Sequence, residues 1–234
     1  GAFDNCFNIF NLSLPNSITK IGEEAFMGCT NMECLTLGIG LCSCGSNAFE
    51  GCYNLHSLHI PSIQDWCKIT FETNWANPLY YAESFIINGK RISNLNIPEG
   101  ITQINKYAFI YNQHIKSVFI SKSVNRIEED AFEGCDNLSK VEVENLSTWC
   151  GIDFEGELAN PLCIAEKLYK EGVELRNVLL VGVPSVSEYA FMNCTSIVSL
   201  EADNSLLSVG KEAFRNCANL TTVKFDRALK DIQA

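Results

Sequence analysis

The chain has 234 residues, 47% of them hydrophobic and only six of them proline, so its composition is that of an ordered protein rather than a disordered tail. Its net charge of −11, with 17 scattered basic residues, argues against nucleic acid and anionic lipid surfaces as partners, because both require clustered Lys and Arg. No apolar run approaches the roughly 18 residues of a membrane-spanning helix, and a signal peptide is either absent or already removed.

One short motif, Ala-Phe-x-x-Cys, recurs along the whole chain. It begins at Ala2 and returns at positions 25, 48, 131, 190 and 213, and a copy at Ala108 carries Asn112 in place of the cysteine. Neighbouring copies are separated by about 23 residues, or by about 60 residues where a longer stretch intervenes, and such self-similarity is typical of a solenoid, a propeller or an array. We therefore predict one repeat domain over residues 1–234, in which each unit contacts its neighbours.

After each motif the chain enters an apolar pattern of the type Leu-x-x-Leu-x-Leu. Its last apolar positions alternate with polar ones, and this period of two predicts a strand with one buried face. Pro15, Pro61 and Pro98 follow three of the strands and end them, because proline lacks a backbone N–H. A return to a pair such as Ile21-Gly22 comes next, and Ala-Phe-x-x-Cys then predicts one tight helical turn. The predicted strands centre on Leu12, Leu35, Leu58, Leu95, Val118, Val141, Val178, Leu200 and Val223.

Two coils are longer than the others, one around residues 63–100 and one around residues 145–186. Each contains the pattern Trp-Cys-x-Ile-x-Phe, beginning at Trp66 or Trp149, and then Ala-Asn-Pro-Leu. The strand-to-strand spacing is about 23 residues across a short coil and about 37 residues across a long one, within the range of periods that marks repeat architectures. The chain is therefore built from a higher-order block, roughly 83 residues long, that holds two short coils and one long coil.

Each long coil ends in a turn, Asn88-Gly89 or Glu171-Gly172. Asn-Gly between apolar runs is a strong hairpin signal, and Glu-Gly is a weaker one. Together these elements predict an α/β solenoid, a right-handed superhelix with one parallel sheet of about nine strands and short helical turns on the opposite side. At roughly 4.8 Å between neighbouring strands, that sheet would be about 40 Å long.

The full pattern, Ile-x-x-Ile-Gly-x-x-Ala-Phe-x-x-Cys-x-x-Leu-x-x-Leu-x-Ile-Pro, resembles the BspA-like class of leucine-rich repeats over essentially the whole chain. That class occurs on surface proteins of gut and oral bacteria and of some parasitic protists. The resemblance implies a secreted or cell-surface protein that binds host proteins or other cells, without enzymatic activity in the repeats. The chain departs from the pattern at Asn112 and at Cys44-Gly45, where an Ile-Gly pair is expected. Because it opens and stops inside a repeat, we expect a segment of a longer protein.

Half of the twelve cysteines occupy the repeat position that Asn112 also occupies. We expect a ladder of small side chains that bond to the backbone of the turn, with the cysteines buried and reduced. Equivalent residues on parallel coils point the same way, so their Cβ vectors do not converge as a disulfide requires. Cys67 and Cys150 likewise occupy a repeat position, beside the tryptophans. The predicted ladder consists of Cys6, Cys29, Cys52, Asn112, Cys135, Cys194 and Cys217.

Four cysteines lie outside these positions. Cys34, Cys42 and Cys44 are close in sequence and suggest a soft metal site, but the fourth ligand that tetrahedral zinc requires is missing. Cys163 has no partner that the sequence identifies. We therefore expect neither a metal nor a cofactor.

The sequence contains no catalytic motif of the common kinds, such as a P-loop, Gly-x-Ser-x-Gly or His-Glu-x-x-His. The histidines are His56, His59 and His114, and no spacing supplies one of them with both a nucleophile and an orienting group. We expect that the chain is not an enzyme. Asn-x-Ser/Thr sequences begin at Asn11, Asn137, Asn145, Asn193 and Asn219, and they are glycosylation acceptors only in a eukaryotic host.

A function must then come from the surface. The outward residues of the strands predict a concave face that is polar and nearly neutral, with Phe119 and Leu179 as its only large apolar members. Exposed aromatic residues are favoured anchors at interfaces. Single exposed apolar residues are also common and need no functional explanation.

The first long coil adds aromatic residues that the repeat does not need. Trp75 and Tyr80 correspond to Leu158 and Cys163 in the second long coil, so neither is required to build the coil, and Tyr81 follows directly. Insertions in a solenoid often gather on a binding face. The candidate partner-binding residues are Trp75, Tyr80, Tyr81, Phe119, His59, Asn94 and Asn96.

Two functions remain open from the sequence. The first is a non-enzymatic, extracellular or cell-surface binding module that engages a protein or cell-surface ligand through the concave sheet or the long-coil hairpins. The second is a passive spacer that displays another domain. An enzyme or a metalloprotein is a third alternative, raised only by the closely spaced cysteines. We expect a monomer that neither binds nucleic acid nor inserts into a membrane.

Overall fold

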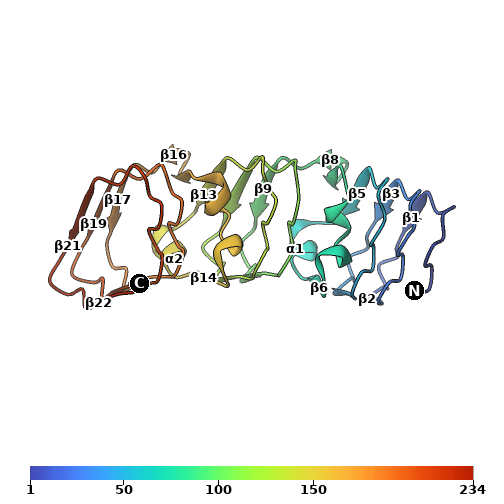
Figure 1. Cartoon of the computed structure of the whole chain (residues 1–234), viewed down its shortest axis with the longest axis horizontal. Helices are drawn as coiled ribbons and strands as arrows, with labels where there is room; N and C mark the ends of the chain where they lie inside the picture. The colour runs from blue at the N-terminus through green and yellow to red at the C-terminus, as the bar shows by residue number, and fades with distance from the viewer. Residues whose placement is uncertain (234) are drawn as a thin grey trace. The chain divides into compact units, whose positions relative to one another are not determined.

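The computed structural model describes residues 1–233 as successive coils of a parallel β-solenoid (Figure 1). Strands one coil apart pair in parallel at the predicted register, for example Leu12 with Leu35 and Val118 with Val141. The solenoid predicted from the repeat period is thus confirmed. The contacts divide the chain into two compact units, which are described separately. Unit 1 comprises residues 1–93, 105–115 and 130–136, and unit 2 comprises residues 94–104, 116–129 and 137–234.

Unit 1 has a sheet on each of two sides of its coils. The front sheet has the order β1-β3-β5-β7-β8, and the back sheet, of very short strands, has the order β2-β4-β6. The front strands are β1 (Asn11–Ser13), β3 (Cys34–Thr36), β5 (Ser57–Ile60), β7 (Phe85–Ile87) and β8 (Lys90–Arg91). The back strands are β2 (Lys20–Ile21), β4 (Ser43–Cys44) and β6 (Thr70–Phe71).

Unit 2 repeats this plan twice. Its front strands form the sheets β9-β11-β13-β15-β16 and β17-β19-β21, and its back strands form β10-β12-β14 and β18-β20-β22. The front strands are β9 (Asn94–Ile97), β11 (Ser117–Ile120), β13 (Lys140–Val143), β15 (Leu168–Lys170), β16 (Val173–Glu174), β17 (Asn177–Leu180), β19 (Ser199–Ala202) and β21 (Thr222–Phe225). The back strands are β10 (Gln103–Ile104), β12 (Arg126–Ile127), β14 (Asp153–Phe154), β18 (Ser185–Val186), β20 (Ser208–Val209) and β22 (Asp231–Ile232).

The nine predicted strands are present, but the prediction of one continuous sheet is wrong. In unit 2, β15 pairs in parallel with β13, and its other edge is taken by β16, which runs antiparallel to it. No edge is left for β17, which therefore starts a new sheet. In unit 1, β8 takes the free edge of β7 in the same way. Each predicted hairpin thus ends a front sheet.

The prediction that Ala-Phe-x-x-Cys forms a helical turn is also wrong. The motif forms consecutive turns in which every second N–H donates to the next coil, as Phe26 does to Ala48 O at 2.9 Å and Gly28 to Glu50 O at 2.7 Å. The residue before the alanine and the residue before the cysteine have positive φ, which turns alternate peptide groups away from a helix axis. The residues before the ladder position are Asn5, Gly28, Gly51, Tyr111, Gly134, Asn193 and Asn216.

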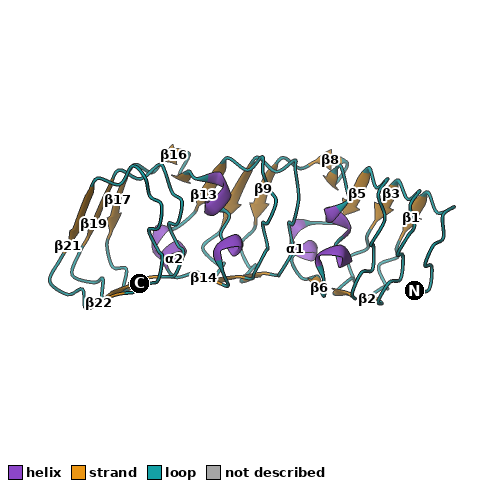
Figure 2. Ribbon diagram, in the orientation of Figure 1, coloured by secondary structure: helices purple, strands orange, loops and turns teal. Residues whose placement is uncertain are grey.

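Within residues 1–233, helices occur only in the long coils, as the purple segments of Figure 2 show. α1 begins after Ser62, whose hydroxyl accepts the backbone N–H of Asp65, and α2 begins after Asn145, whose side chain accepts the N–H of Thr148. These are N-caps of the usual kind. The helices are α1 (Ile63–Trp66), η1 (Asn74–Ala76), η2 (Pro78–Tyr80), α2 (Leu146–Cys150), η3 (Glu157–Ala159) and α3 (Leu162–Ala165).

The core between the sheets is built from stacked, equivalent side chains. Because its phenylalanine returns at one place in each short coil, the repeat motif predicts a column of stacked rings inside the solenoid. The rings stack in neighbouring short coils, Phe26 on Phe49 with centroids 5.5 Å apart and Phe109 on Phe132 at 5.3 Å, which confirms the column within the short coils. The tryptophans of the long coils are buried too. The indole N–H of Trp66 donates to Ala108 O at 2.8 Å, a carbonyl of the following short coil.

Candidate binding surfaces

The front sheet of unit 2 carries an aromatic residue in a polar row. Phe119 in β11 lies between Asn96 of β9 and Glu142 of β13, with which it is paired in register. These side chains point away from the core because Val118 and Ile120, the neighbours of Phe119 along the strand, point inward and are buried. The ring is half-buried in this row, so part of it stays accessible.

A second row of side chains, Asn94, Ser117 and Lys140, runs beside the first and fixes the orientation of the Asn94 amide. The Ser117 hydroxyl donates to Asn94 Oδ1 at 2.8 Å, so the Asn94 carbonyl oxygen is engaged and its NH₂ remains available. Beside it, Lys140 Nζ lies 2.7 Å from Glu142 Oε2, and the hydrogen bond from this lysine lowers the pKa of the Glu142 carboxyl. The two rows enclose a hollow of about 290 Å³, whose lining includes Asn94, Asn96, Ser117, Phe119 and Glu142.

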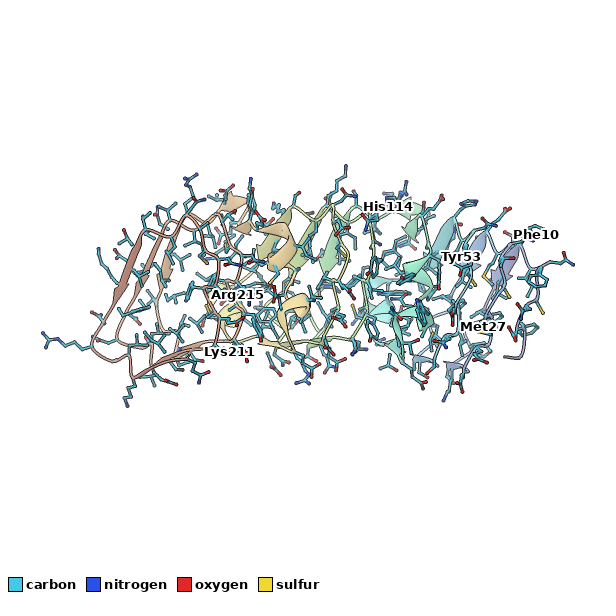
Figure 3. All side chains as sticks on the ribbon, in the orientation of Figure 1. Phe10, Met27, Tyr53, His114, Lys211 and Arg215 are labelled. Carbon is cyan, nitrogen blue, oxygen red and sulfur yellow. The ribbon has the colours of Figure 1, made fainter. Side chains whose placement is uncertain are left out.

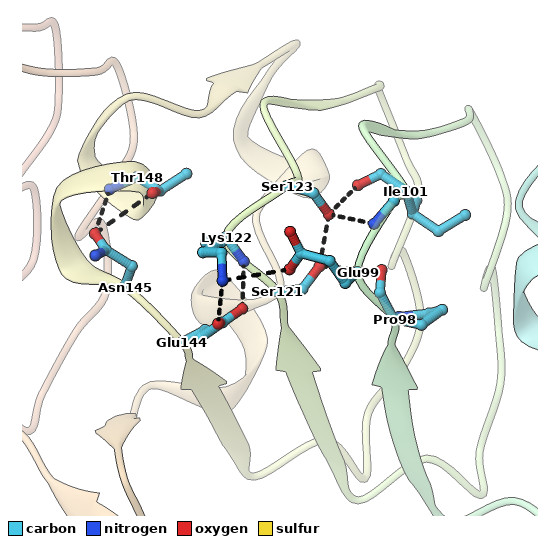
Figure 4. A network of polar contacts seen from close by, with 10 residues as sticks. Pro98, Glu99, Ile101, Ser121, Lys122, Ser123, Glu144, Asn145 and Thr148 are labelled. Atoms are coloured by element: carbon cyan, nitrogen blue, oxygen red, sulfur yellow. Dashed lines mark hydrogen bonds and ion pairs between the residues drawn. The ribbon is translucent and has the colours of Figure 1, made fainter.

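A wider hollow of about 580 Å³ continues from Phe119 toward the ends of the strands, where charged residues line it. Lys122 Nζ lies 3.0 Å from Glu144 Oε1 and 3.9 Å from Glu99 Oε2, and the Lys122 N–H also donates to Glu144 (Figure 4). These bonds lower the pKa of the Glu144 carboxyl. Beside this network, the Ser123 hydroxyl donates to Ile101 O at 2.8 Å and holds two coils together. The charged residues at this end of the hollow are therefore paired with one another.

Unit 2 contains a second hollow at the equivalent place of the next block. It also measures about 290 Å³, and its lining includes Asn177, Leu179, Ser199 and Glu201. The Ser199 hydroxyl donates to Asn177 Oδ1 at 2.7 Å, as Ser117 does to Asn94. Leu179 is paired with Glu201, so an apolar side chain again lies beside a carboxylate. The two blocks thus carry similar surface hollows as well as similar coils.

Unit 1 carries a different kind of surface, a row of four tyrosines, which we name the tyrosine row. Tyr53 and Tyr81 have ring centroids 5.8 Å apart, Tyr81 and Tyr80 are 4.9 Å apart, and Tyr80 and Tyr111 are 4.9 Å apart. Tyr53 is 73% exposed and Tyr111 is 40% exposed, so both ends of the row meet solvent. The position of Tyr53 is labelled in Figure 3.

The sequence identified only the middle of the tyrosine row. Tyr80 and Tyr81 were expected as contacts because they lie outside the repeat pattern, whereas Tyr53 and Tyr111 belong to short coils. One signal for Tyr111 was present in the sequence. It occupies the position before the ladder residue, where each of the other six short coils has glycine or asparagine.

Trp75 and His59, the other candidate residues of unit 1, lie outside the tyrosine row. Trp75 is 40% exposed, but no ring contact within residues 1–233 joins it to Tyr80 or Tyr81. His59 lies half-buried on the front of β5, between Thr36 and Ile86. In unit 2 the candidates form one cluster on β9 and β11. In unit 1 Tyr80 and Tyr81 belong to the tyrosine row, whereas Trp75 and His59 do not.

The remaining histidines are engaged with charged neighbours. His56 Nδ1 lies 3.0 Å from Glu83, and a ring nitrogen of His114 lies 2.7 Å from the Arg91 guanidinium. Burial, and then the charge of Arg91, lower the pKa of His114, which is labelled in Figure 3. In the part of the chain that the structure describes, no three His, Cys, Asp or Glu side chains are grouped as a metal ion would require.

The ladder position has two kinds of occupant. Each of four cysteines donates its thiol to the carbonyl of the phenylalanine one coil earlier, for example Cys135 to Phe109 O at 3.1 Å. Asn112 has the opposite role, because its Oδ1 accepts the N–H groups of His114 and Ile115 in its own turn. All twelve cysteines are unpaired in the structure. Their redox state in solution stays a prediction that a thiol count tests.

Two buried asparagines, which the sequence did not single out, close the long coils in the same manner. Asn77 donates to Tyr107 O at 2.7 Å and accepts the N–H of Leu79, and Asn160 makes the equivalent bonds in the second long coil. Both belong to the repeated Ala-Asn-Pro-Leu sequence, which was the signal for them in the sequence.

Among residues 1–233, no helix has the length and the apolar character needed to cross a bilayer.

The family model of the BspA type leucine-rich repeat region matches the chain in six copies, over residues 1–77, 65–151 and 164–234. Among curated proteins, none matches the chain.

Solved structures of leucine-rich repeat proteins are similar to it at low identity. A leucine-rich cell-surface protein from Faecalibacterium prausnitzii A2-165 has 20% identity and a TM-score of 0.44, with coverage of 95% of this chain and 71% of that one. A leucine-rich repeat protein from Eubacterium ventriosum has 16% identity and a TM-score of 0.45, covering 97% and 69%. The pneumococcal vaccine antigen PcpA has 14% identity and a TM-score of 0.45, covering 94% and 52%.

Proposed function

Because the chain belongs to the BspA type leucine-rich repeat family, we propose that it is a non-enzymatic binding module of a secreted or cell-surface protein. Its partner is a protein or a cell-surface ligand, and the binding surface is the front of β9, β11 and β13. The observation that carries this proposal is the half-exposed ring of Phe119, which lies in a hollow bordered by amide and carboxylate groups.

The composition of this surface suits a protein partner. Interfaces commonly place an aromatic anchor at their centre and polar groups at their rim. Here the available NH₂ of Asn94 and the carboxylate of Glu142 supply a donor and an acceptor on either side of the ring. The pairs that hold these groups, Ser117 with Asn94 and Lys140 with Glu142, reduce the side-chain ordering that binding would otherwise require.

The proposal is tested by screening the whole chain against extracellular-matrix proteins and intact cells, and then by measuring the affinity of Phe119→Ala for any partner found. Loss of a central anchor should weaken binding about thirty-fold, roughly 2 kcal/mol. Phe7→Ala, which removes an exposed phenylalanine of unit 1, is the matched control and should bind like the parent chain.

An affinity that is unchanged in Phe119→Ala, with the circular dichroism spectrum preserved, would remove this surface from the proposal. A screen without any partner would instead favour the second function, a passive spacer that displays another domain.

A further inference from the structure

We propose that the tyrosine row of unit 1 is a second binding site, which takes an extended, proline-rich peptide segment that carries arginine or lysine. This inference goes beyond the proposed function, because it concerns a different surface and a different ligand. It rests on the ring geometry, on the backbone of Tyr111 and on the charges beside the row.

The ring geometry favours a ridged surface over a flat one. Neighbouring rings are inclined by 79° between Tyr53 and Tyr81, by 59° between Tyr81 and Tyr80, and by 56° between Tyr80 and Tyr111. Inclined rings in contact with one another give the row a ridged outer surface, and a polyproline II helix docks on grooves lined by aromatic rings. A sugar ring would need a flat, open aromatic face, which the edge of the next tyrosine obstructs at the inner rings.

The dimensions also agree. The three ring-to-ring steps are 5.8, 4.9 and 4.9 Å, so the row extends over at most about 16 Å, the length of about five residues of a polyproline II helix at ~3.1 Å each. One turn of that helix, about 9.3 Å, is close to two solenoid steps of about 4.8 Å. A ligand lying along the row would therefore meet a tyrosine ring at each successive turn.

The backbone of Tyr111 is the second observation. Tyr111 has φ = 53°, the left-handed region, at the position where all six other short coils have glycine or asparagine. Large residues adopt this region elsewhere in the repeat too, as Tyr107 and Tyr189 do before the alanine, so the feature particular to Tyr111 is that a large aromatic residue replaces glycine or asparagine. This residue is the one that ends the tyrosine row, with its ring on Tyr80.

The charges beside the row select a basic ligand. Tyr111 lies near Glu133 and Asp136, with its hydroxyl 3.5 Å from Glu133 Oε1, and Tyr81 lies near Glu50. Within residues 1–233, none of these three carboxylates forms an ion pair with a Lys, Arg or His side chain. Burial and the neighbouring Asp130 raise the pKa of the Glu133 carboxyl, so an incoming guanidinium would relieve an unfavourable charge.

The test is isothermal titration of the whole chain with a dodecapeptide of prolines carrying an arginine near each end. Two further peptides are compared with it, one with glutamate in place of the arginines and one with the arginines in a Gly-Ser background. The first peptide should bind at least tenfold more tightly than either of the others. A neutral hexasaccharide is titrated in parallel, and binding of the saccharide without binding of the proline peptide would overturn the proposal.

Two variants locate the site. Tyr111→Asn gives this coil the residue found at the same position in other coils, so its melting temperature should equal or exceed that of the parent chain while peptide affinity falls at least tenfold. Tyr53→Ser should also weaken binding, and Phe10→Ala, an exposed aromatic of the same unit outside the row, should not. Full affinity in both tyrosine variants would overturn the proposal. The Phe119→Ala variant should bind the peptide normally, because Phe119 is not part of the tyrosine row. If the tyrosine row does not bind the peptide, the proposed binding surface on β9, β11 and β13 is therefore unaffected.

Discussion

Removing one phenylalanine from the stacked column tests the account of the core most directly. Phe132 is 0% exposed, and its ring stacks on Phe109 with centroids 5.3 Å apart and planes inclined by 22°. Burying such a side chain contributes about 1.5–3 kcal/mol, and the aromatic pair adds about 0.5–1.5 kcal/mol. Because the parallel coils above and below cannot collapse into the space, Phe132→Ala should lower the free energy of unfolding by about 3–5 kcal/mol.

The measurement is urea denaturation followed by far-ultraviolet circular dichroism. The matched control is Phe3→Ala, because Phe3 is 49% exposed and stacks only on Phe26, so its loss should be less than half as large. Since a repeat protein is stabilised by interfaces between neighbouring coils, the slope of the transition must be compared as well as its midpoint. A loss below roughly 1 kcal/mol for Phe132→Ala would refute the buried column.

Thiol titration in denaturant without reductant should recover all twelve cysteines as free thiols, and a count that is lower by two, or by a multiple of two, would reveal disulfides. In the native protein, exposed Cys42 should react far faster than buried Cys135. Burial raises the pKa of Cys135 and Cys52 from 9.0 to about 12, so the unfolded chain loses these thiol protons at a lower pH than the folded chain does. The free energy of unfolding should therefore fall as the pH rises from 9 toward 12, by about 1.4 kcal/mol per pH unit for each buried thiol. A urea midpoint that stays constant between pH 8 and pH 10 would contradict that. Gly134→Ala places a Cβ 2.6 Å from the Tyr111 ring at φ = 69° and should cost more than about 1 kcal/mol, whereas Gly151→Ala, with no contact under 3.5 Å, should cost little.

The repeat period was enough to predict the solenoid, the strand positions and the buried column, because each depends on a residue type that returns at a fixed interval. The helical turn was predicted wrongly, because Ala-Phe-x-x-Cys has the apolar spacing of a helix. The glycine or asparagine before the ladder residue was the contrary signal, since both tolerate positive φ. The interrupted sheet was missed because a hairpin signal shows that two strands pair, but not which outer edge the second strand takes.

The candidate sites were predicted only in part. Phe119, Asn94 and Asn96 could be assigned to one face from the alternation along β9 and β11, and the structure places them around one hollow. The tyrosine row could not be assembled from the sequence, because its members come from three coils whose turns differ in length. The separation of Tyr53 and Tyr81 along the chain matches neither the short nor the long period of the repeat.

The bonds that close the long coils bear on how such a chain changes length during evolution. In both blocks a buried Trp and a buried Asn donate to the same carbonyl of the following short coil, Ala108 O in one case and Ala190 O in the other. The junction between blocks is therefore chemically identical wherever it occurs. Each short coil carries this alanine, and its carbonyl accepts the Phe N–H when the preceding coil is short, as Ala131 O accepts Phe109 N–H at 2.8 Å. The same carbonyl can therefore receive either a short or a long coil. Duplication or loss of a coil at this junction would leave the donors of the preceding coil with an acceptor.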